Sequence, residues 1–507
     1  MPKNFRVRLG MTQRRLIITA NNDSLGSIRP LPRLTQGALS ASEVIASSLA
    51  NVAPAMSFMF SFAVIAQGAG TASGLTIAIV AVAILFHANS IAQFSVKIPS
   101  SGSYITYIGK TFGPVAGVVT AILAAFGYIA STAGLMAVLG GWTAIILAHF
   151  LHIHIAWEMI TIALVGWLGF LMVRGVKIST RWLVGGFFFE MAAIVLISVL
   201  TLVRHHGPLT FAAFNPADLK GGLAGIGVGF PIAIWMFTGV GNSMGLAEDT
   251  KRPRTLIPRA IYLSLGFAAV VYLSLAWITT MALHNRASFI ASQPVPLITV
   301  GALVLGPLLI VAYLAGFTST LAEIIGATNG QARMLFSAAR DGLLPHALSR
   351  VSRRHAPTTA LAVYLGFGLM ATLIWGFFTP PITLFGYLGS LAGIPIALIY
   401  MAVNVAVPVY YRRHHRRDFR WTTHVAWPLL GTLVMILPLA AMAAPGQNPP
   451  YSYFPILVVG VIVAGLIYAW YLVHQKPDLG QNMGNVLADD GYDDGLDHEE
   501  LGRRNMG

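Results

Sequence analysis

Two glutamates stand inside long apolar stretches of this sequence. Glu190 lies within residues 180–203 and Glu323 within residues 297–338, and neither stretch contains a lysine. A charge in such surroundings is unfavourable by several kcal/mol, so these carboxyl groups must face a cavity or a partner. Because burial favours the neutral form of a carboxyl group, both are candidate proton carriers. The alternative for each is a hydrogen-bonded structural glutamate. Ala327 follows Glu323 by four residues and shares its helix face.

Two other apolar stretches are interrupted by helix-breaking residues. One contains APAMS at 53–57, with Pro54 near its middle, and the other contains WMFTGVGN at 235–242. In lipid, backbone groups must be bonded within a helix unless they line a protected cavity. Paired interruptions at corresponding positions indicate the binding site of an inverted-repeat transporter. The alternative is a proline kink in one helix and close glycine packing in the other.

The first interruption has the chemistry to bind a carboxylate. The N–H groups at the start of the second half of a broken helix attract anions. Pro54 has no N–H to donate. We therefore expect the amides of Ala55, Met56 and Ser57 to hold a substrate carboxylate.

The second interruption supplies acceptors and aromatic rings. The carbonyl groups of Trp235 and Thr238, on either side of Phe237 and next to Gly239, are predicted to accept from an ammonium group. Trp235 and Phe237 are predicted to cover the site or to stack against an amine. A zwitterionic amino acid would suit both interruptions together.

The elements that position these residues are predicted to be membrane-spanning helices. Of 507 residues, 56% are hydrophobic and 10% are charged. A soluble protein of this length needs more polar residues to cover its surface. The basic residues cluster in short loops, a topogenic pattern rather than a nucleic-acid-binding stripe. We therefore expect an all-α polytopic protein of the lipid bilayer, with no nucleic-acid partner.

Twelve stretches are long enough to cross a membrane, since a span needs about 20 apolar residues. They are residues 42–66, 74–96, 114–149, 156–173, 180–203, 223–246, 257–283, 297–338, 358–378, 382–410, 424–444 and 452–474. With the N-terminus inside, eighteen Lys and Arg fall in cytoplasmic loops and three in external ones. This imbalance predicts a cell-membrane protein with both termini in the cytoplasm.

Several function classes are excluded. Cysteine is absent, so disulfides and Cys-ligated metals are excluded. No phosphate-binding loop, nucleophile elbow or dinucleotide-binding glycine pattern occurs. We expect neither an ATP-driven pump nor an enzyme, and no cofactor or metal.

Four sets of motifs resemble those of the amino acid–polyamine–organocation (APC) superfamily of permeases. They are KIPSSGSYITY at 97–107 with FGP at 112–114; RGVKIS at 174–179; FTGV at 237–240 with AEDTKRP at 247–253 and IPRA at 257–260; and ARDGLLP at 339–345. In this order and spacing, the likeness covers about residues 35–475.

This resemblance implies a LeuT-like fold. A cytoplasmic segment (1–38) would precede a ten-helix core (39–410) built as a five-plus-five inverted repeat, with discontinuous helices 1 and 6. Two additional helices (411–474) and a disordered acidic cytoplasmic tail (475–507) would follow.

The resemblance also implies roles for particular positions. Residues 53–55, which are Ala53, Pro54 and Ala55, match a Gly-Ser-Gly-like bend in relatives, and Trp235 matches an aromatic residue over the substrate. Gly127, Tyr128 and Ala327 match pocket-lining positions.

Two positions depart from the family pattern. Gly241 replaces a glutamate found in some relatives, and Glu190 replaces a lysine that stands in for a sodium ion in several.

Proton-coupled import of an amino acid is the function we expect, with sodium coupling still open. The alternatives within the fold are an exchanger and a permease for polyamines or other organic cations, because Glu190 and Glu323 could pair with a second amine. From another class, an ion channel would show single-channel currents without saturable uptake. The sequence determines neither the substrate nor the oligomeric state.

Overall fold

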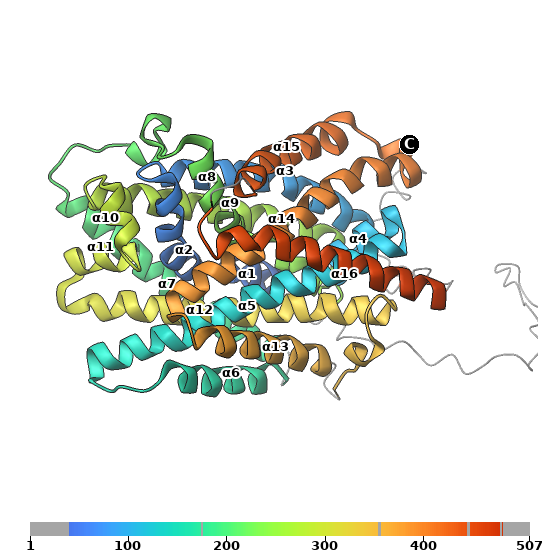
Figure 1. Ribbon diagram of the computed structural model, residues 1–507, viewed down its shortest axis with the longest axis horizontal. Helices are drawn as coiled ribbons and strands as arrows, with labels where there is room; N and C mark the ends of the chain where they lie inside the picture. The colour runs from blue at the N-terminus through green and yellow to red at the C-terminus, as the bar shows by residue number, and fades with distance from the viewer. Residues whose placement is uncertain (1–39, 174–175, 353–355, 444–446, 477–478, 480–507) are drawn as a thin grey trace, which may run out of the picture.

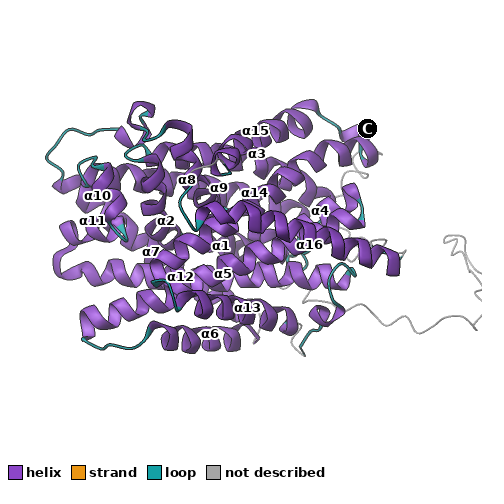
Figure 2. Ribbon diagram, viewed as in Figure 1, coloured by secondary structure: helices purple, strands orange, loops and turns teal. Residues whose placement is uncertain are grey.

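The described part of the chain is helical. The computed structural model describes residues 40–173, 176–352, 356–443, 447–476 and 479. The predicted segment 1–38 and the acidic residues of the predicted tail lie outside them. Within the described residues the elements are helices joined by loops (Figure 2), with an isolated antiparallel bridge between Gly70 and Leu219. The all-α prediction is confirmed for these residues.

The α-helices follow one another closely along the chain. They are α1 (Ala41–Asn51), α2 (Pro54–Ala69), α3 (Ser73–Lys97), α4 (Ser103–Phe112), α5 (Pro114–Leu151), α6 (Trp157–Val173), α7 (Val176–Arg204), α8 (Gly222–Met236), α9 (Pro253–Ala282), α10 (Ala287–Ser292), α11 (Pro296–Leu305), α12 (Leu309–Arg340), α13 (Thr358–Gly376), α14 (Pro381–His414), α15 (Trp427–Met442) and α16 (Phe454–Gln475). A 3₁₀ segment, η3 (Thr238–Leu246), follows α8.

Nine helical segments of the described chain are long and apolar enough to cross a membrane. They are Ser73–Lys97, Pro114–Leu151, Gly185–Arg204, Gly225–Leu246, Pro253–Ala282, Pro296–Arg340, Thr358–Gly376, Pro381–His414 and Tyr451–Gln475. Shorter apolar helices, Pro54–Ala69, Trp157–Val173 and Thr422–Ile436, occupy the places of the first, fourth and eleventh predicted spans.

The eighth predicted span differs from the expected single helix. It consists of α11 and α12, separated at Gly306 (φ 55°) and Pro307. Gly306 combines a positive φ with ψ −123°, a conformation that glycine adopts readily and that lies outside helical geometry. The following proline cannot supply the amide that would continue the helix.

The long helices lie roughly side by side in one bundle (Figure 1). α5 has 38 residues, which corresponds to about 57 Å, and it packs against α14, while α12 packs against α7. α6 and α13 pack together at one edge, and α3 and α15 at the opposite edge. The shorter α1 and α2 lie in the interior, where α2 packs against α8.

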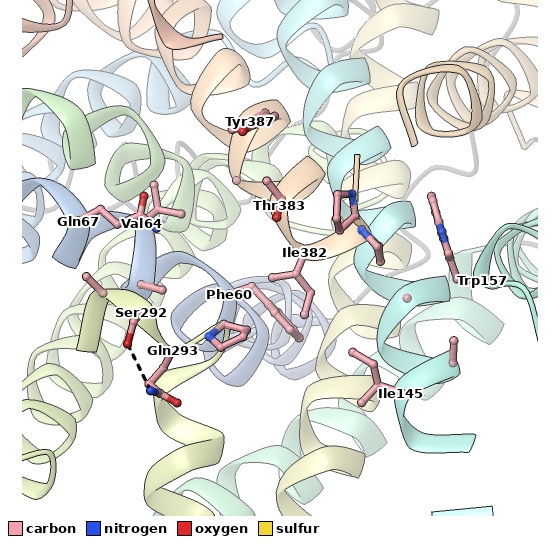
Figure 3. Close-up of a pocket in the computed structure, with 18 of the residues that line it drawn as sticks. Phe60, Val64, Gln67, Ile145, Trp157, Ser292, Gln293, Ile382, Thr383 and Tyr387 are labelled. Carbon is pink, nitrogen blue, oxygen red and sulfur yellow. Dashed lines mark hydrogen bonds between the residues drawn. The ribbon is translucent and has the colours of Figure 1, made fainter. Parts of the chain in front are cut away.

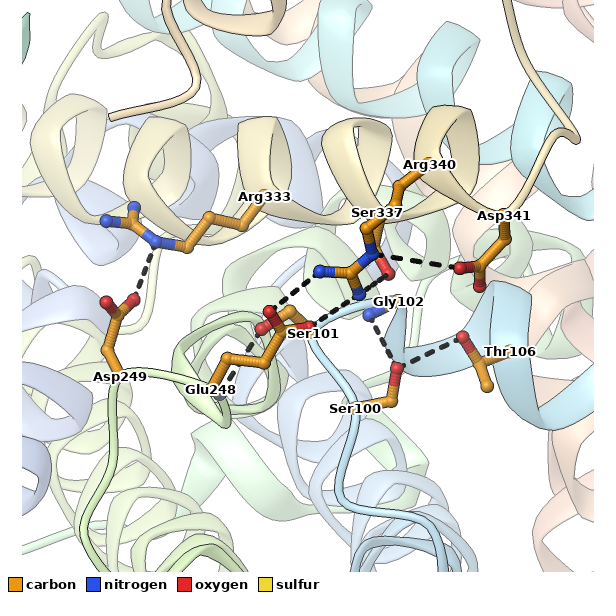
Figure 4. Close-up of polar contacts among 10 residues, drawn as sticks. All are labelled: Ser100, Ser101, Gly102, Thr106, Glu248, Asp249, Arg333, Ser337, Arg340 and Asp341. Carbon is orange, nitrogen blue, oxygen red and sulfur yellow. Dashed lines mark hydrogen bonds and ion pairs between the residues drawn. The ribbon is translucent and has the colours of Figure 1, made fainter. Parts of the chain in front are cut away.

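A buried ion-pair cluster holds the end of η3 against α12 (Figure 4). Arg340 donates to both carboxylate oxygens of Glu248, at 2.9 and 2.8 Å, and Arg333 donates to Asp249 at 2.8 Å. Burial raises the pKa of Asp249 above its ordinary value, and the Arg333 guanidinium opposes this rise. The Glu248 amide donates to Ser101 at 3.4 Å.

This cluster explains three of the sequence motifs. Ser101 belongs to the motif at 97–107, Glu248 and Asp249 to that at 247–253, and Arg340 to that at 339–345. The three segments are far apart in sequence and meet at one point. Their shared role is to bind η3 and the start of α4 to the end of α12.

Arg340→Ala is expected to lower the free energy of unfolding by about 3–5 kcal/mol, because it leaves the buried Glu248 carboxylate unpaired. The measurement is Tm of the purified protein in detergent. The control is Lys97→Ala, which removes the exposed ion pair with Asp418. An exposed pair adds little stability, so equal Tm values for the two variants would contradict this account.

Candidate functional site

The first interruption separates α1 from α2. α1 ends at Asn51, Ala53 adopts a left-handed conformation (φ 41°, ψ 64°), and Pro54 begins α2. Proline disfavours helical geometry in the residue before it and is well suited to a first helical position. The left-handed conformation is unfavourable for alanine by roughly 1–2 kcal/mol, so the surrounding packing must hold it in place.

The second interruption separates α8 from η3. α8 ends at Met236, and the chain continues through Phe237 as a 3₁₀ segment. The Thr238 hydroxyl donates to the carbonyl of Trp235 at 2.8 Å. One of the two predicted ammonium acceptors is therefore already bonded, although a carbonyl oxygen can accept a second hydrogen bond.

The two interruptions are in direct contact. A Cβ atom on Gly239 would overlap the carbonyl oxygen of Asn51, and a Cβ on Gly326 of α12 would overlap the Asn51 side chain. These positions have room only for glycine. The backbones of α1 and η3 thus meet where each helix loses its regular hydrogen bonds.

Tyr272 of α9 bridges the two interruptions. Its buried hydroxyl lies 3.0 Å from the carbonyl of Val52 and 3.0 Å from that of Met236, two groups released by the breaks. Its ring packs edge-on against Phe237 at 5.1 Å. Tyr272 was not predicted as a site residue, because in the sequence it is one more aromatic side chain in an apolar stretch.

The three amides predicted to bind a carboxylate already have acceptors. Ala55 N–H donates to Oε2 of Glu190 at 3.3 Å, and Met56 N–H donates to Oγ of Ser319 at 3.0 Å. Ser57 N–H donates to the carbonyl of Ala53 at 3.0 Å. The carboxylate that lies at the N-terminus of α2 is the chain's own Glu190.

Glu323 joins the same group. Its Oε2 lies 3.4 Å from the Ser57 hydroxyl, which also lies 3.0 Å from the carbonyl of Val52. Glu190 and Glu323 are both buried and close enough to interact electrostatically. Ser319 precedes Glu323 by one turn of α12, so the helical spacing was a signal that could have identified it.

Trp235 packs beside the interruptions in a fixed orientation. Its Nε1 donates to Ser131 of α5 at 2.6 Å, and its ring meets Phe385 of α14 edge-on at 5.0 Å. Both contacts come from helices distant in sequence. Ser131, like Tyr272, was not singled out from the sequence.

The remaining predicted pocket residues lie on the helices around the interruptions. Gly127 faces α14, where a Cβ would lie 2.9 Å from Pro395. The carbonyl of Tyr128 accepts from the Tyr364 hydroxyl at 3.0 Å. Ala327 is buried one turn after Glu323. The structure thus gives Gly127 and Tyr128 packing and hydrogen-bonding roles between helices.

A cavity of 640 Å³ lies among α2, α5 and α14, and Figure 3 shows the residues that line it. Phe60 lines the cavity and packs against Phe385, which in turn contacts Trp235. The described lining is apolar, aromatic or uncharged polar, with Val64, Gln67, Ile145, Trp157, Ser292, Gln293, Ile382, Thr383 and Tyr387 among its members.

Comparison with known proteins places these features in a family. A profile of the family described as "Amino acid permease" matches residues 39–467. A branched-chain amino acid permease of Bacillus subtilis is 25% identical over 69% of this chain and 77% of its own length. A methylthioribose transporter of the same organism is 25% identical over 75% of this chain and 88% of its own length. An L-methionine/branched-chain amino acid exporter of Escherichia coli is 28% identical over 54% of this chain and 64% of its own length.

Gly239→Ala is expected to destabilise the protein, because the added methyl group would push η3 away from Asn51. The expected loss is about 1–3 kcal/mol, as for overpacked interiors, measured as a fall in Tm in detergent. Gly266→Ala is the matched control. Gly266 is exposed on α9 and has open space around it. There alanine should be neutral or slightly stabilising, and an equal fall in both variants would refute the contact.

Proposed function

Because this chain belongs to the amino acid permease family, we propose that it is a secondary transporter that imports amino acids by alternating access, coupled to protons. Membership of the family makes it an amino acid transporter rather than an enzyme. Import and proton coupling are the proposed refinements. The observation that carries them is the pair of interrupted helices in contact, with two buried carboxyl groups beside them.

The proposed architecture has twelve membrane helices. Residues 39–410 would form the five-plus-five inverted repeat, with α1 and α2 as its first helix and α8 and η3 as its sixth. Residues 411–474 would add two helices. Both termini would face the cytoplasm, as the distribution of Lys and Arg favours.

The proposed substrate site lies between the two interruptions. The substrate carboxylate would approach the N-terminus of α2, at residues 53–57, and its ammonium group would approach the carbonyl groups around Trp235 and Thr238. Trp235, held by Ser131, would cover the substrate together with Phe237. Gly239 would allow the close approach of backbones, while Gly127, Tyr128 and Ala327 would shape the surrounding wall.

The proposed coupling groups are Glu190 and Glu323. Each is buried and bonded to α2, Glu190 through the Ala55 amide and Glu323 through the Ser57 hydroxyl. A change of protonation at either group would alter how the helix is held. This is the physical link that coupling requires, because proton binding and substrate binding then act on the same element.

A second candidate is transport of polyamines or other organic cations. Pro54 offers no N–H and the Ala55 amide is already bonded to Glu190, which weakens the case for a substrate carboxylate. Two carboxyl groups in the same place favour an amine. Exchange of one substrate for another is compatible with the same site.

Trp235→Ala is expected to reduce uptake at least tenfold while leaving the protein folded, because the ring packed beside the interruptions is removed. The measurement is initial uptake rate in proteoliposomes, with Tm as the test of folding. Trp470→Ala is the control, since Trp470 is exposed on α16. Normal kinetics in Trp235→Ala would remove this residue from the substrate site.

A competition screen across the amino acids and putrescine tests the proposed function directly. Uptake into proteoliposomes is expected to be saturable and to become uphill when the outside is acidic. Glu190→Gln should abolish the uphill component, whereas Glu158→Gln, in the first turn of α6, should keep it. Uphill uptake driven by sodium alone, or inhibition by putrescine alone, would contradict proton-coupled amino acid import.

A further inference from the structure

We propose that Glu190 is an internal competitor of the substrate carboxylate: amino acid binding displaces it from the Ala55 amide, and the displaced carboxylate takes up a proton. This inference rests on the proposed function. It assigns the proton to one residue and links its uptake to one chemical group of the substrate. It also predicts that substrates without a carboxylate bind without proton uptake.

The geometry places Glu190 where a ligand carboxylate would bind. The N-terminus of a helix attracts anions through its unbonded N–H groups and its dipole. α2 begins with Pro54, which has no N–H, so Ala55 carries the first available donor. Oε2 of Glu190 accepts from that donor at 3.3 Å. The distance is long for a charge-assisted hydrogen bond, for which about 2.7–2.9 Å is usual, so a better-placed carboxylate can displace it.

The second carboxyl oxygen of Glu190 is unusual. Oε1 is buried and has no hydrogen-bond partner among the described residues. A buried carboxylate normally has its oxygens bonded, because an unpaired charged acceptor is costly. Oε1 therefore has a vacant lone pair, which is available to accept a proton once Oε2 leaves the Ala55 amide.

Few other ionisable groups face Glu190. Glu323 of α12 and Tyr272 of α9 interact with it electrostatically, and both carry either no charge or a negative one. α2 and α11 contain no ionisable residue, α1 has only Glu43 in its first turn, and α6 only Glu158 in its first turn. The cations of α12, Arg333 and Arg340, are paired with Asp249 and Glu248, and Arg254 and Arg259 of α9 are exposed. A proton is therefore the group left to neutralise a displaced Glu190 carboxylate.

The charges balance in a way that distinguishes substrates. With Glu190 ionised and Glu323 protonated, the empty site carries one negative charge. A zwitterionic amino acid is neutral, so protonation of Glu190 makes the loaded site neutral. An amine without a carboxylate brings one positive charge and leaves Glu190 ionised on the Ala55 amide, which also gives a neutral site. A neutral site is the favoured state in a low-dielectric environment.

The test is titration calorimetry of the purified protein in buffers of different ionisation enthalpy, which reports protons taken up on binding. The probes are the amino acid bound best in the competition screen and its decarboxylated amine, which for L-leucine is 3-methylbutan-1-amine. Across a pH series, we expect a maximum of about one proton per amino acid and about none for the amine. Glu190→Gln should bind the amino acid with the proton uptake lost, whereas Glu158→Gln, in the first turn of α6, should retain it.

A measurement on the unmodified protein tests the same inference. An infrared difference spectrum should show a new carboxylic acid band on amino acid binding and none on amine binding. Equal proton uptake for both probes, or unchanged uptake in Glu190→Gln, would overturn the inference while leaving proton-coupled transport intact. Failure of every amino acid to bind would overturn the proposed function itself.

Discussion

Backbone hydrogen bonding inside the membrane is the constraint on which this structure depends. A peptide group in lipid must be bonded within its helix or by a neighbouring group, and two helices here are broken in the interior. The groups that each break releases are bonded by side chains from other helices. The Tyr272 hydroxyl lies within hydrogen-bond distance of a carbonyl group at each break, and Glu190 and Ser319 accept hydrogen bonds from amides of the first break. The breaks are therefore stable features of the fold, and they are bonded by side chains that can move or change protonation.

This arrangement makes the two broken helices a single unit. Gly239 lets the backbone of η3 approach the backbone of Asn51 closely, and Gly326 leaves space for the Asn51 side chain. Tyr272 then joins both breaks from a third helix, and the Arg340–Glu248 pair fixes the far end of η3 to α12. A displacement of one broken helix must disturb the other, which is the mechanical property that the proposed alternating access would require.

The electrostatics of the interior follow from the same arrangement. Glu190 and Glu323 are bonded to α2, which begins at the break, while the described cavity next to the Phe60–Phe385 pair has an uncharged lining. At the place where the backbone is broken, a proton, an ammonium group or a carboxylate would change the balance of charge.

The sequence by itself determined the helical class, the approximate limits of the apolar segments, the two interruptions and the buried glutamates. These properties follow from local composition: apolar length, proline and glycine positions, and isolated charges. Only the tertiary structure decided which groups bond the broken backbone. Glu190 reaches Ala55 across 135 positions of sequence and Ser319 reaches Met56 across 263, and no local pattern encodes such pairs. Two of the three amides that appeared free in sequence, those of Ala55 and Met56, are bonded in this way because helix packing brings distant side chains to them. The third, that of Ser57, is bonded locally to the carbonyl of Ala53.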